Sequence, residues 1–375
     1  MKKDQNIRQS KTKINVKEFI NDPFKGKTGF MPDEVPESIS TRIGLNENLV
    51  FPKEIMDQLL LEVAKTIDPR VYPEDYSQSL CQLIAEQHDI NPNQIVVGNG
   101  GDKIIDLVVR LTIKCGNSSV IIRPTYPMYE HATKVQGGTL TSLLLTPSPE
   151  FDLNPDYILS NITPGKDRLL FLCSPNNPTG NQFDRSKLET LIQEFPGIVA
   201  LDETYAIFAD YSMVASLDTY PNLIIMKSLS KFYGMAGMRV GYCLSSEIIA
   251  SRMKELLPAF NVNIASQKLA QLVLHQTKVH QQMIDTIVQE RERLYNEMQK
   301  ISEITPYKSY TNFILFKTLK APAQTINKKM IEKGVLLRNM SGMPHCDNTL
   351  RVTITTKENN DRFLKALKNV LEKEI

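Results

Sequence analysis

The sequence has no tryptophan, few cysteines, and acidic and basic residues that nearly balance at a net charge of +2. This balance gives no indication of nucleic-acid binding. The five cysteines are odd in number and follow no paired spacing, so neither a disulfide framework nor a zinc site is expected. We expect buried thiols at Cys81, Cys115, Cys173, Cys243 and Cys346.

Other signals are also missing. No apolar run is long enough to span a bilayer, and no apolar segment follows the basic residues near the N-terminus, so we expect a cytoplasmic protein. The five histidines show no metal-ligand spacing, and no metal site is expected. The sequence shows neither paired carboxylates nor a Gly-x-Ser-x-Gly turn, the two patterns that would indicate hydrolase chemistry.

What is present is an alternation of helical patterns with short apolar strands from about residue 50 to 245. This alternation predicts an α/β fold, a mostly parallel sheet with helices on both faces. Apolar residues from Met283 to Ile301 recur at helical spacing and predict a long amphipathic helix. We expect a large domain over residues 50–245, then this interdomain helix and a small α+β domain over 246–375, joined by the N-terminal segment 1–49.

The most informative stretch is Ser228–Gly241, which follows the apolar strand candidate Leu223–Met226. It places Lys231 among hydroxyl side chains, with Arg239 shortly after, at a strand exit where open α/β sheets bind ligands. A lysine can carry a Schiff base. The stretch therefore suits an aldehyde cofactor that bears a phosphate.

Three other strand candidates end in polar residues. Strand 197–201 leads to Asp202, and a carboxylate at the end of a buried strand needs a cationic partner. Strand 169–173 ends in the turn Ser174–Gly180. Strand 94–97 leads through a glycine turn into a helical pattern, and free backbone amides at a helix start bind phosphate.

Together these segments resemble the class I/II pyridoxal-phosphate-dependent aminotransferases of fold type I. The resemblance implies that Lys231 holds pyridoxal phosphate as a Schiff base and later acts as general acid and base. It implies that Asp202 keeps the ring nitrogen protonated, and that Asn177 and Tyr205 bond to the phenolate oxygen. The phosphate would be held by Gly101, Asp102, Ser228, Ser230 and Arg239.

The segment Arg123–Tyr129 resembles the family's Pro-x-Tyr-x-x-Tyr segment, whose first tyrosine stacks on the cofactor ring. Tyr126 is the stacking candidate, and the alternative for it and Tyr129 is packing at a helix start. The chain departs from the family at the glycine turn. It has Gly101 and Lys103 where a small residue or serine and an acidic residue are usual, but backbone donation survives both changes.

Near the C-terminus, Gly334–Arg338 and Thr349–Ile354 are expected to form two short strands that each carry an arginine. Arg351 resembles the family arginine that grips a substrate α-carboxylate. A second arginine at the spacing of Arg338 resembles histidinol-phosphate aminotransferases, where it helps to hold the substrate phosphate; a surface ion pair is the alternative.

Further segments resemble the same subfamily. Gly44–Asn48 resembles its entry motif, which makes Asn46 a substrate-binding candidate, and the strand that carries Asn312 adds a second. Val71–Glu74 resembles the segment whose tyrosine, here Tyr72, reaches the cofactor phosphate of the partner in a homodimer. Valine stands at position 71 where arginine is common.

The resemblance implies an enzyme that transfers an amino group from histidinol phosphate to 2-oxoglutarate in histidine biosynthesis. A threonine-phosphate decarboxylase or an aromatic aminotransferase would share nearly all of these motifs. An aminotransferase-like effector-sensing module of a transcription regulator is a remote alternative, because the segment before Leu45 has no basic helix-turn-helix pattern. The expected partners are small-molecule substrates and a second copy of the chain, with neither nucleic acid nor membrane.

Overall fold

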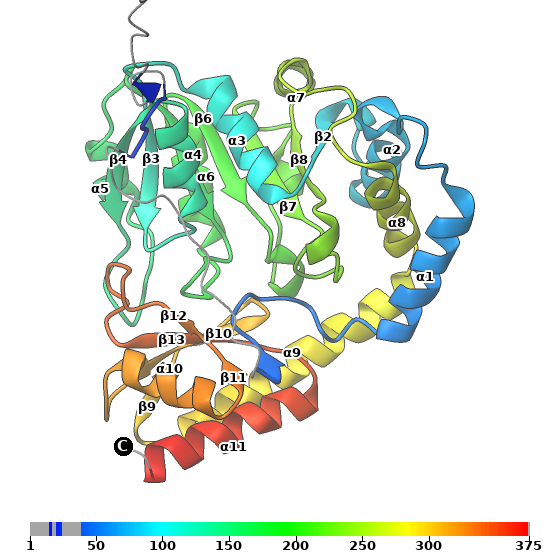
Figure 1. Ribbon diagram of the computed structural model, residues 1–375. Coiled ribbons are helices and arrows are strands. Elements are labelled where there is room, and N and C mark those ends of the chain that lie inside the picture. Colours follow the sequence, from blue (N-terminus) through cyan, green and yellow to red (C-terminus); the bar gives the residue numbers. More distant parts are fainter. Residues whose placement is uncertain (1–14, 17–19, 25–38, 374–375) are drawn as a thin grey trace, which may run out of the picture.

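The computed structural model describes residues 15–16, 20–24 and 39–373. Two sheets of unequal size form separate layers, and helices cover the larger one on both faces (Figure 1). Within the described ranges, no helix is both long and apolar enough to cross a membrane.

The larger sheet has seven strands in the order β2-β8-β7-β6-β5-β3-β4. All neighbouring strands are parallel except at β8, which is antiparallel to both β2 and β7. The strands are β2 Ile95–Gly98, β3 Ser118–Arg123, β4 Thr139–Leu144, β5 Asp167–Cys173, β6 Ile198–Asp202, β7 Leu223–Ser228 and β8 Gly241–Ser245. This arrangement confirms the predicted α/β class of the fold.

The core lies on both faces of this sheet because its central strands carry runs of consecutive apolar residues. In β5, Leu170 and Leu172 belong to one buried cluster while Leu169 and Phe171 belong to the other. Helices α3 Gly101–Thr112, α4 Met128–Val135 and α7 Glu247–Glu255 cover the second face. The first face is covered by α2 Gln78–His88, α5 Pro155–Ser160, α6 Arg185–Glu194 and α8 Ile264–Leu274.

The smaller, four-stranded sheet is antiparallel, in the order β12-β13-β10-β9. Its strands are β9 Ile304–Pro306, β10 Phe313–Thr318, β12 Arg338–Asn339 and β13 Thr349–Thr353. Helices α10 Ala323–Glu332 and α11 Lys357–Lys373 pack near it. The predicted strand 334–338 is instead divided, since β11 Val335–Leu336 pairs in parallel with β1 Thr41–Arg42 and only β12 joins this sheet.

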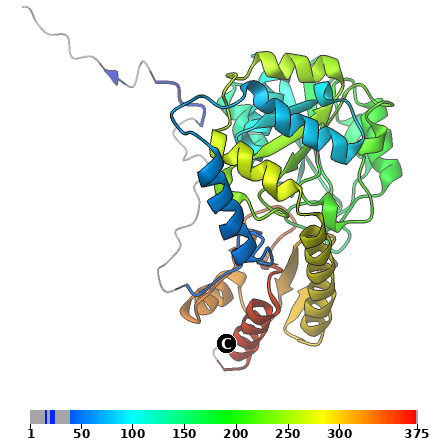
Figure 2. The same cartoon turned by 90° about the vertical axis from the view of Figure 1, so that its right-hand side faces the viewer.

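Helix α9, Thr277–Gln299, connects the two layers. Its buried face includes Met283, Ile287, Leu294 and Met298, so the predicted amphipathic helix is confirmed, with its start six residues earlier. Figure 2 shows α9 extending from the large sheet along the smaller one. The remaining elements are α1 Lys53–Thr66 and the 3-10 turns η2 Asp75–Ser77, η3 Pro92–Gln94, η4 Ala206–Phe208, η5 Val214–Ser216 and η6 Ala236–Met238.

All five cysteines are free thiols in the structure. Four are buried, but Cys115 is exposed, so the expectation of a buried thiol was wrong there. It lies between the end of α3 and the start of β3, at the rim of the sheet where connections run over the surface.

Candidate active site

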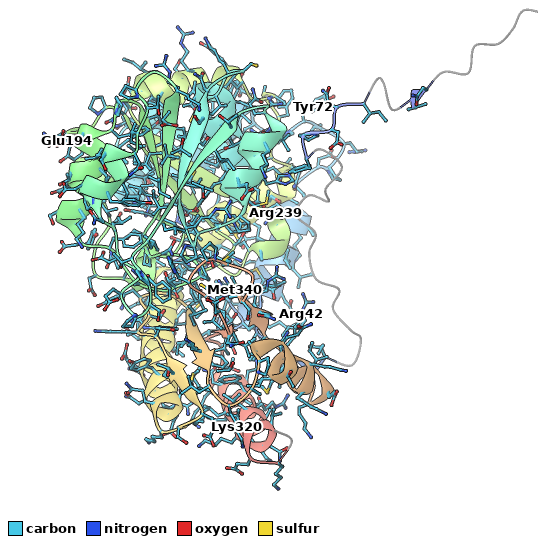
Figure 3. The ribbon with its side chains drawn as sticks, turned by 90° about the vertical axis from the view of Figure 1, so that its left-hand side faces the viewer. Arg42, Tyr72, Glu194, Arg239, Lys320 and Met340 are labelled. Atoms are coloured by element: carbon cyan, nitrogen blue, oxygen red, sulfur yellow. The ribbon has the colours of Figure 1, made fainter. Side chains whose placement is uncertain are left out.

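A cavity of about 360 Å³ lies where the carboxyl ends of β5, β6 and β7 face the smaller sheet. Figure 3 labels Arg239 from the large unit and Met340 from the small one, and both line this cavity. Thirteen of the fifteen site residues expected from the sequence line it: Asn46, Gly101, Asp102, Tyr126, Asn177, Asp202, Tyr205, Ser228, Ser230, Lys231, Arg239, Arg338 and Arg351.

Lys231 enters the cavity from the turn after β7. Its Nζ donates a hydrogen bond to the backbone oxygen of Leu45 at 2.7 Å. Burial, followed by the positive charge of Arg351, lowers the pKa of Lys231 to about 8. A lysine with such a pKa keeps a sizeable fraction of neutral amine near neutral pH, which is the form that attacks a carbonyl.

Asp202 is the last residue of β6 and its side chain is buried. Its Oδ2 accepts a hydrogen bond from the Tyr129 hydroxyl at 2.7 Å, and its Oδ1 accepts one from the backbone nitrogen of Thr204 at 2.9 Å. Burial raises the pKa of Asp202, and hydrogen bonds from Thr204 and Tyr129 oppose this rise. A buried carboxylate of this kind is strongly stabilised by a cation placed beside it.

A second group of contacts joins the loop 44–48 to the cavity wall. Asn46 donates from Nδ2 to the hydroxyl of Tyr205 at 2.9 Å. Arg351 donates from Nη2 to the backbone oxygen of Gly44 at 2.9 Å and from Nη1 to Oδ1 of Asn177. Because Oδ1 of Asn177 faces the arginine, its Nδ2 is the atom that remains to donate into the cavity.

One end of the cavity is suited to an anion. Helix α3 begins at Gly101, after Gly100 with φ of 89°. Among the described residues, none gives the buried Ser230 Oγ a hydrogen-bond partner. Backbone amides at the start of a twelve-residue helix, together with an unsatisfied hydroxyl, form an anion-binding end.

Asp102 lies at this end, but its carboxylate already has donors. Its Oδ2 is 3.0 Å from Nη2 of Arg239, and its Oδ1 accepts from the Tyr126 hydroxyl at 3.0 Å. Burial, followed by the charge of Asp102, raises the pKa of Tyr126 well above its ordinary value, so this phenol stays protonated. Asp102 therefore orients an arginine and an aromatic ring toward the cavity.

Two arginines line the cavity from the smaller sheet. Arg338 in β12 and Arg351 in β13 are paired in register, so their side chains leave the same face of the sheet. The Arg351 guanidinium lies 5.0 Å from the centre of the Phe313 ring. Burial lowers the pKa of Arg351 to about 10, and the charge of Arg338 adds to this effect. An anion between the two guanidiniums would relieve both effects.

Comparison with known proteins decides the family. The sequence pattern of the family Aminotransferase class I and II matches residues 45–367. The chain belongs to this family. It is 31% identical over 357 residues to a histidinol-phosphate aminotransferase of Caldanaerobacter subterraneus subsp. tengcongensis, covering 95% of this chain and 99% of that protein. It is 38% identical over 300 residues to the same enzyme of Flavobacterium psychrophilum, covering 79% and 85%.

The fold agrees. A crystal structure of histidinol-phosphate aminotransferase from Sinorhizobium meliloti in complex with pyridoxal 5'-phosphate superposes with a TM-score of 0.84 at 23% identity, covering 92% of this chain and 96% of that one. The protein is thus a pyridoxal-phosphate-dependent aminotransferase of fold type I.

The residues of this aminotransferase fit its cofactor. The anion-binding end at Gly101 and Ser230 suits a phosphate, Asp202 suits a protonated ring nitrogen, and Lys231 suits the aldehyde. A cavity of about 360 Å³ is large enough for a small aromatic ligand.

Two of the expected site residues lie outside the cavity lining. Asn312 is fully buried behind it, where its Nδ2 donates to the backbone oxygen of Asn46 at 3.2 Å. Tyr72 is 80% exposed and stacks on Phe260, with ring centres 4.7 Å apart. Its expected reach into a partner's site stays a prediction.

Sequence reasoning did not assign several contacts of this aminotransferase. Packing at a helix start was the only role considered for Tyr129, but it also donates to Asp202, while its ring stacks on Phe171 with ring centres 4.5 Å apart. The backbone oxygen of Leu45 as the partner of Lys231 had no side-chain signal at all. Cys173, Thr204, Met340 and Met343 also line the cavity.

Proposed function

We propose that this enzyme transfers the amino group of histidinol phosphate to 2-oxoglutarate, giving imidazole acetol phosphate and glutamate, as a step of histidine biosynthesis. The names of the relatives at 31% and 38% identity support this substrate. The observation that carries it is the in-register pair of Arg338 and Arg351, which line the cavity from the smaller sheet, whereas Gly101, Ser230 and Arg239 line it from the larger unit.

The arginine pair accounts for two different substrates at one site. A substrate phosphate carries close to two negative charges, and two guanidiniums provide matching donors. Glutamate presents an α-carboxylate, which Arg351 can bind through two parallel hydrogen bonds. We assign Arg338 mainly to the phosphate of histidinol phosphate and Arg351 to the carboxylate of glutamate and 2-oxoglutarate.

The other residues take the roles that their surroundings favour. Pyridoxal phosphate, when bound, supplies an aldehyde that accepts the amino group and a ring that withdraws electrons. Lys231 would hold the aldehyde and would move a proton at the carbon that bears the substrate amine. Asp202 holds the ring nitrogen, Asn177 and Tyr205 hold the phenolate oxygen, and Tyr126 orients the ring plane.

The phosphate group of the cofactor is assigned to the anion-binding end. Gly101, Ser228, Ser230 and Arg239 donate to it, with Asp102 holding Arg239 in place. Asn46 contacts the substrate region through its bond to Tyr205, and Asn312 supports Asn46 from behind.

We propose further that two copies share their active sites, with the exposed Tyr72 of one reaching the partner's phosphate end. A cytoplasmic location agrees with five free cysteines.

The test is a single half-reaction. Purified protein is loaded with pyridoxal phosphate, and the absorbance spectrum is recorded before and after histidinol phosphate is added without any keto acid. Conversion of the visible band to that of the amino form of the cofactor is expected. A band that persists with histidinol phosphate but is converted by an aromatic amino acid would contradict the substrate assignment, and release of carbon dioxide from threonine phosphate would favour a decarboxylase.

A further inference from the structure

Glu203 and Lys227 form a deeply buried ion pair, with side chains that are 2% and 13% exposed and charged atoms 2.9 Å apart. The carboxylate of Glu203 accepts two more hydrogen bonds, from the backbone nitrogen of Met213 at 2.6 Å and from Oγ of Ser212. Removing two charges from water is unfavourable unless such partners are supplied. Because the fold supplies three donors to the buried Glu203 carboxylate, the ion pair is a specific part of the structure.

Both residues adjoin residues of the cofactor site. Glu203 follows Asp202 in the sequence, and Lys227 precedes Ser228. Successive side chains of an extended chain point to opposite sides. Accordingly, Asp202 lines the active-site cavity, whereas Glu203 lines a second cavity of about 640 Å³, and Lys227 lies between the two and lines both. The ion pair therefore forms part of the wall between the second cavity and the active-site cavity.

The ion pair lies at the end of the backbone pairing between β6 and β7. Strands β6 and β7 are paired up to Asp202 and Met226, and the backbone nitrogen of Glu203 donates to the oxygen of Met226 at 2.9 Å. Past this point one chain turns into η4 and the other turns toward Lys231. The ion pair ties the two chains together just where their backbone pairing stops.

This tie sets a distance that the cofactor requires. Asp202 is assigned to the ring nitrogen and Ser228 to the phosphate, two groups at different edges of one rigid molecule. If the two strand ends move apart, both contacts cannot be kept at hydrogen-bond length. We propose that Glu203 and Lys227 are positioning residues for pyridoxal phosphate, which fix the spacing of Asp202 and Ser228. The proposal concerns cofactor binding and is independent of which amine is the substrate.

The test measures the affinity of the apoprotein for pyridoxal phosphate. The variant E203Q/K227M removes both charges while keeping side-chain sizes similar, so no lone buried charge remains. We expect its dissociation constant for pyridoxal phosphate to rise at least about tenfold, with an altered visible circular dichroism of the bound cofactor. Variant K227R retains the ion pair and should bind within about threefold of the wild type.

A matched control separates positioning from general stability. Glu290 and Arg293 form another half-buried ion pair, 2.7 Å apart, within α9 and outside the cavity lining. Variant E290Q/R293M should lower the midpoint of thermal unfolding but leave the dissociation constant for pyridoxal phosphate unchanged. Equal weakening by both double variants would overturn the proposal, because it would indicate general destabilisation.

Wild-type affinity and circular dichroism in E203Q/K227M would also overturn it. If that variant does not fold, E203Q alone gives the decision, since its amide oxygen can still accept from the backbone nitrogen of Met213. We expect E203Q to bind pyridoxal phosphate about fivefold more weakly than the wild type. Unchanged affinity in E203Q would contradict the positioning role.

Discussion

Tyr129, whose side chain is fully buried, donates its hydroxyl hydrogen at 2.7 Å to Oδ2 of Asp202, which lines the active-site cavity. The bond favours the ionised carboxylate against the burial that raises its pKa. An ionised Asp202 is what a protonated ring nitrogen needs as its partner. Tyr129 thus links a core position to the electronic state of the cofactor.

Replacing Tyr129 by phenylalanine should lower kcat about tenfold and stability by about 2 kcal/mol, because one hydrogen bond to a charged group is lost without a cavity. Steady-state kinetics and chemical unfolding measure the two effects. Tyr242→Phe is the matched control, as it removes the hydroxyl that lies 3.1 Å from Nε2 of His88, on the other side of the sheet. It should leave kcat unchanged, and an equal loss of kcat in both variants would contradict the role of Tyr129.

Lys231→Ala should reduce kcat by about a thousandfold or more, because both the Schiff base and the proton transfer depend on its amine. The fold should stay intact, which far-ultraviolet circular dichroism would check. Turnover at the wild-type rate would exclude Lys231 as the catalytic lysine.

The lowered pKa of Lys231 gives the apoprotein a defined dependence of stability on pH. Its folded pKa of about 8 lies below the ordinary 10.5, so between these values the unfolded chain binds the extra proton. Stability must then rise with pH across this window, by up to about 1.4 kcal/mol per pH unit. Other groups also titrate there, so the quantity to measure is the difference in unfolding free energy between the wild type and Lys231→Met. A difference that stays flat from pH 8 to 10 would contradict the lowered pKa.

Substitutions of the two arginines of the small sheet should affect the KM values of the two substrates differently. Arg338→Ala should raise KM for histidinol phosphate about tenfold to a hundredfold, with KM for glutamate changed less than about threefold. Arg351→Ala should raise KM for glutamate more strongly than Arg338→Ala does. Arg362, exposed in α11, provides a control arginine whose replacement by alanine should change neither constant. Equal effects of Arg338→Ala on both substrates would count against its phosphate role.

Gly100→Ala should weaken pyridoxal phosphate binding at least about tenfold, because a Cβ there would lie 2.7 Å from Nη2 of Arg239 and displace the guanidinium. The positive φ of 89° adds backbone strain of about 1 kcal/mol or more. Gly116 has a φ of 88° with nothing within 4 Å of its Cβ position. Gly116→Ala should therefore lose similar stability but keep the cofactor affinity, as measured by titration of the apoprotein.

The sequence was sufficient to predict cavity-lining residues that come directly after an apolar strand segment. Apolar runs gave strand positions within a residue or two, and polar residues after them gave Asp202, Ser228 and Lys231. Relations between distant segments had no such signal. The register that sets Arg338 opposite Arg351 depends on where the chain bends between β11 and β12, and the partner of Lys231 is a backbone oxygen 186 residues away. The bond from Tyr129 to Asp202 was not predicted because a buried hydroxyl and a packing ring look alike in sequence.

The pairing of β1 with β11 has a consequence for the order in which the protein is made. Ser40, next to β1, donates to the backbone oxygen of Gly334 across a separation of 294 residues. At about 5 to 20 residues per second, a ribosome needs roughly 15 to 60 s to supply the second of these segments. During that interval β1 has no strand to join, whereas the segments of the seven-stranded sheet emerge earlier. The lysine site can thus form on the nascent chain well before the arginine pair that completes it.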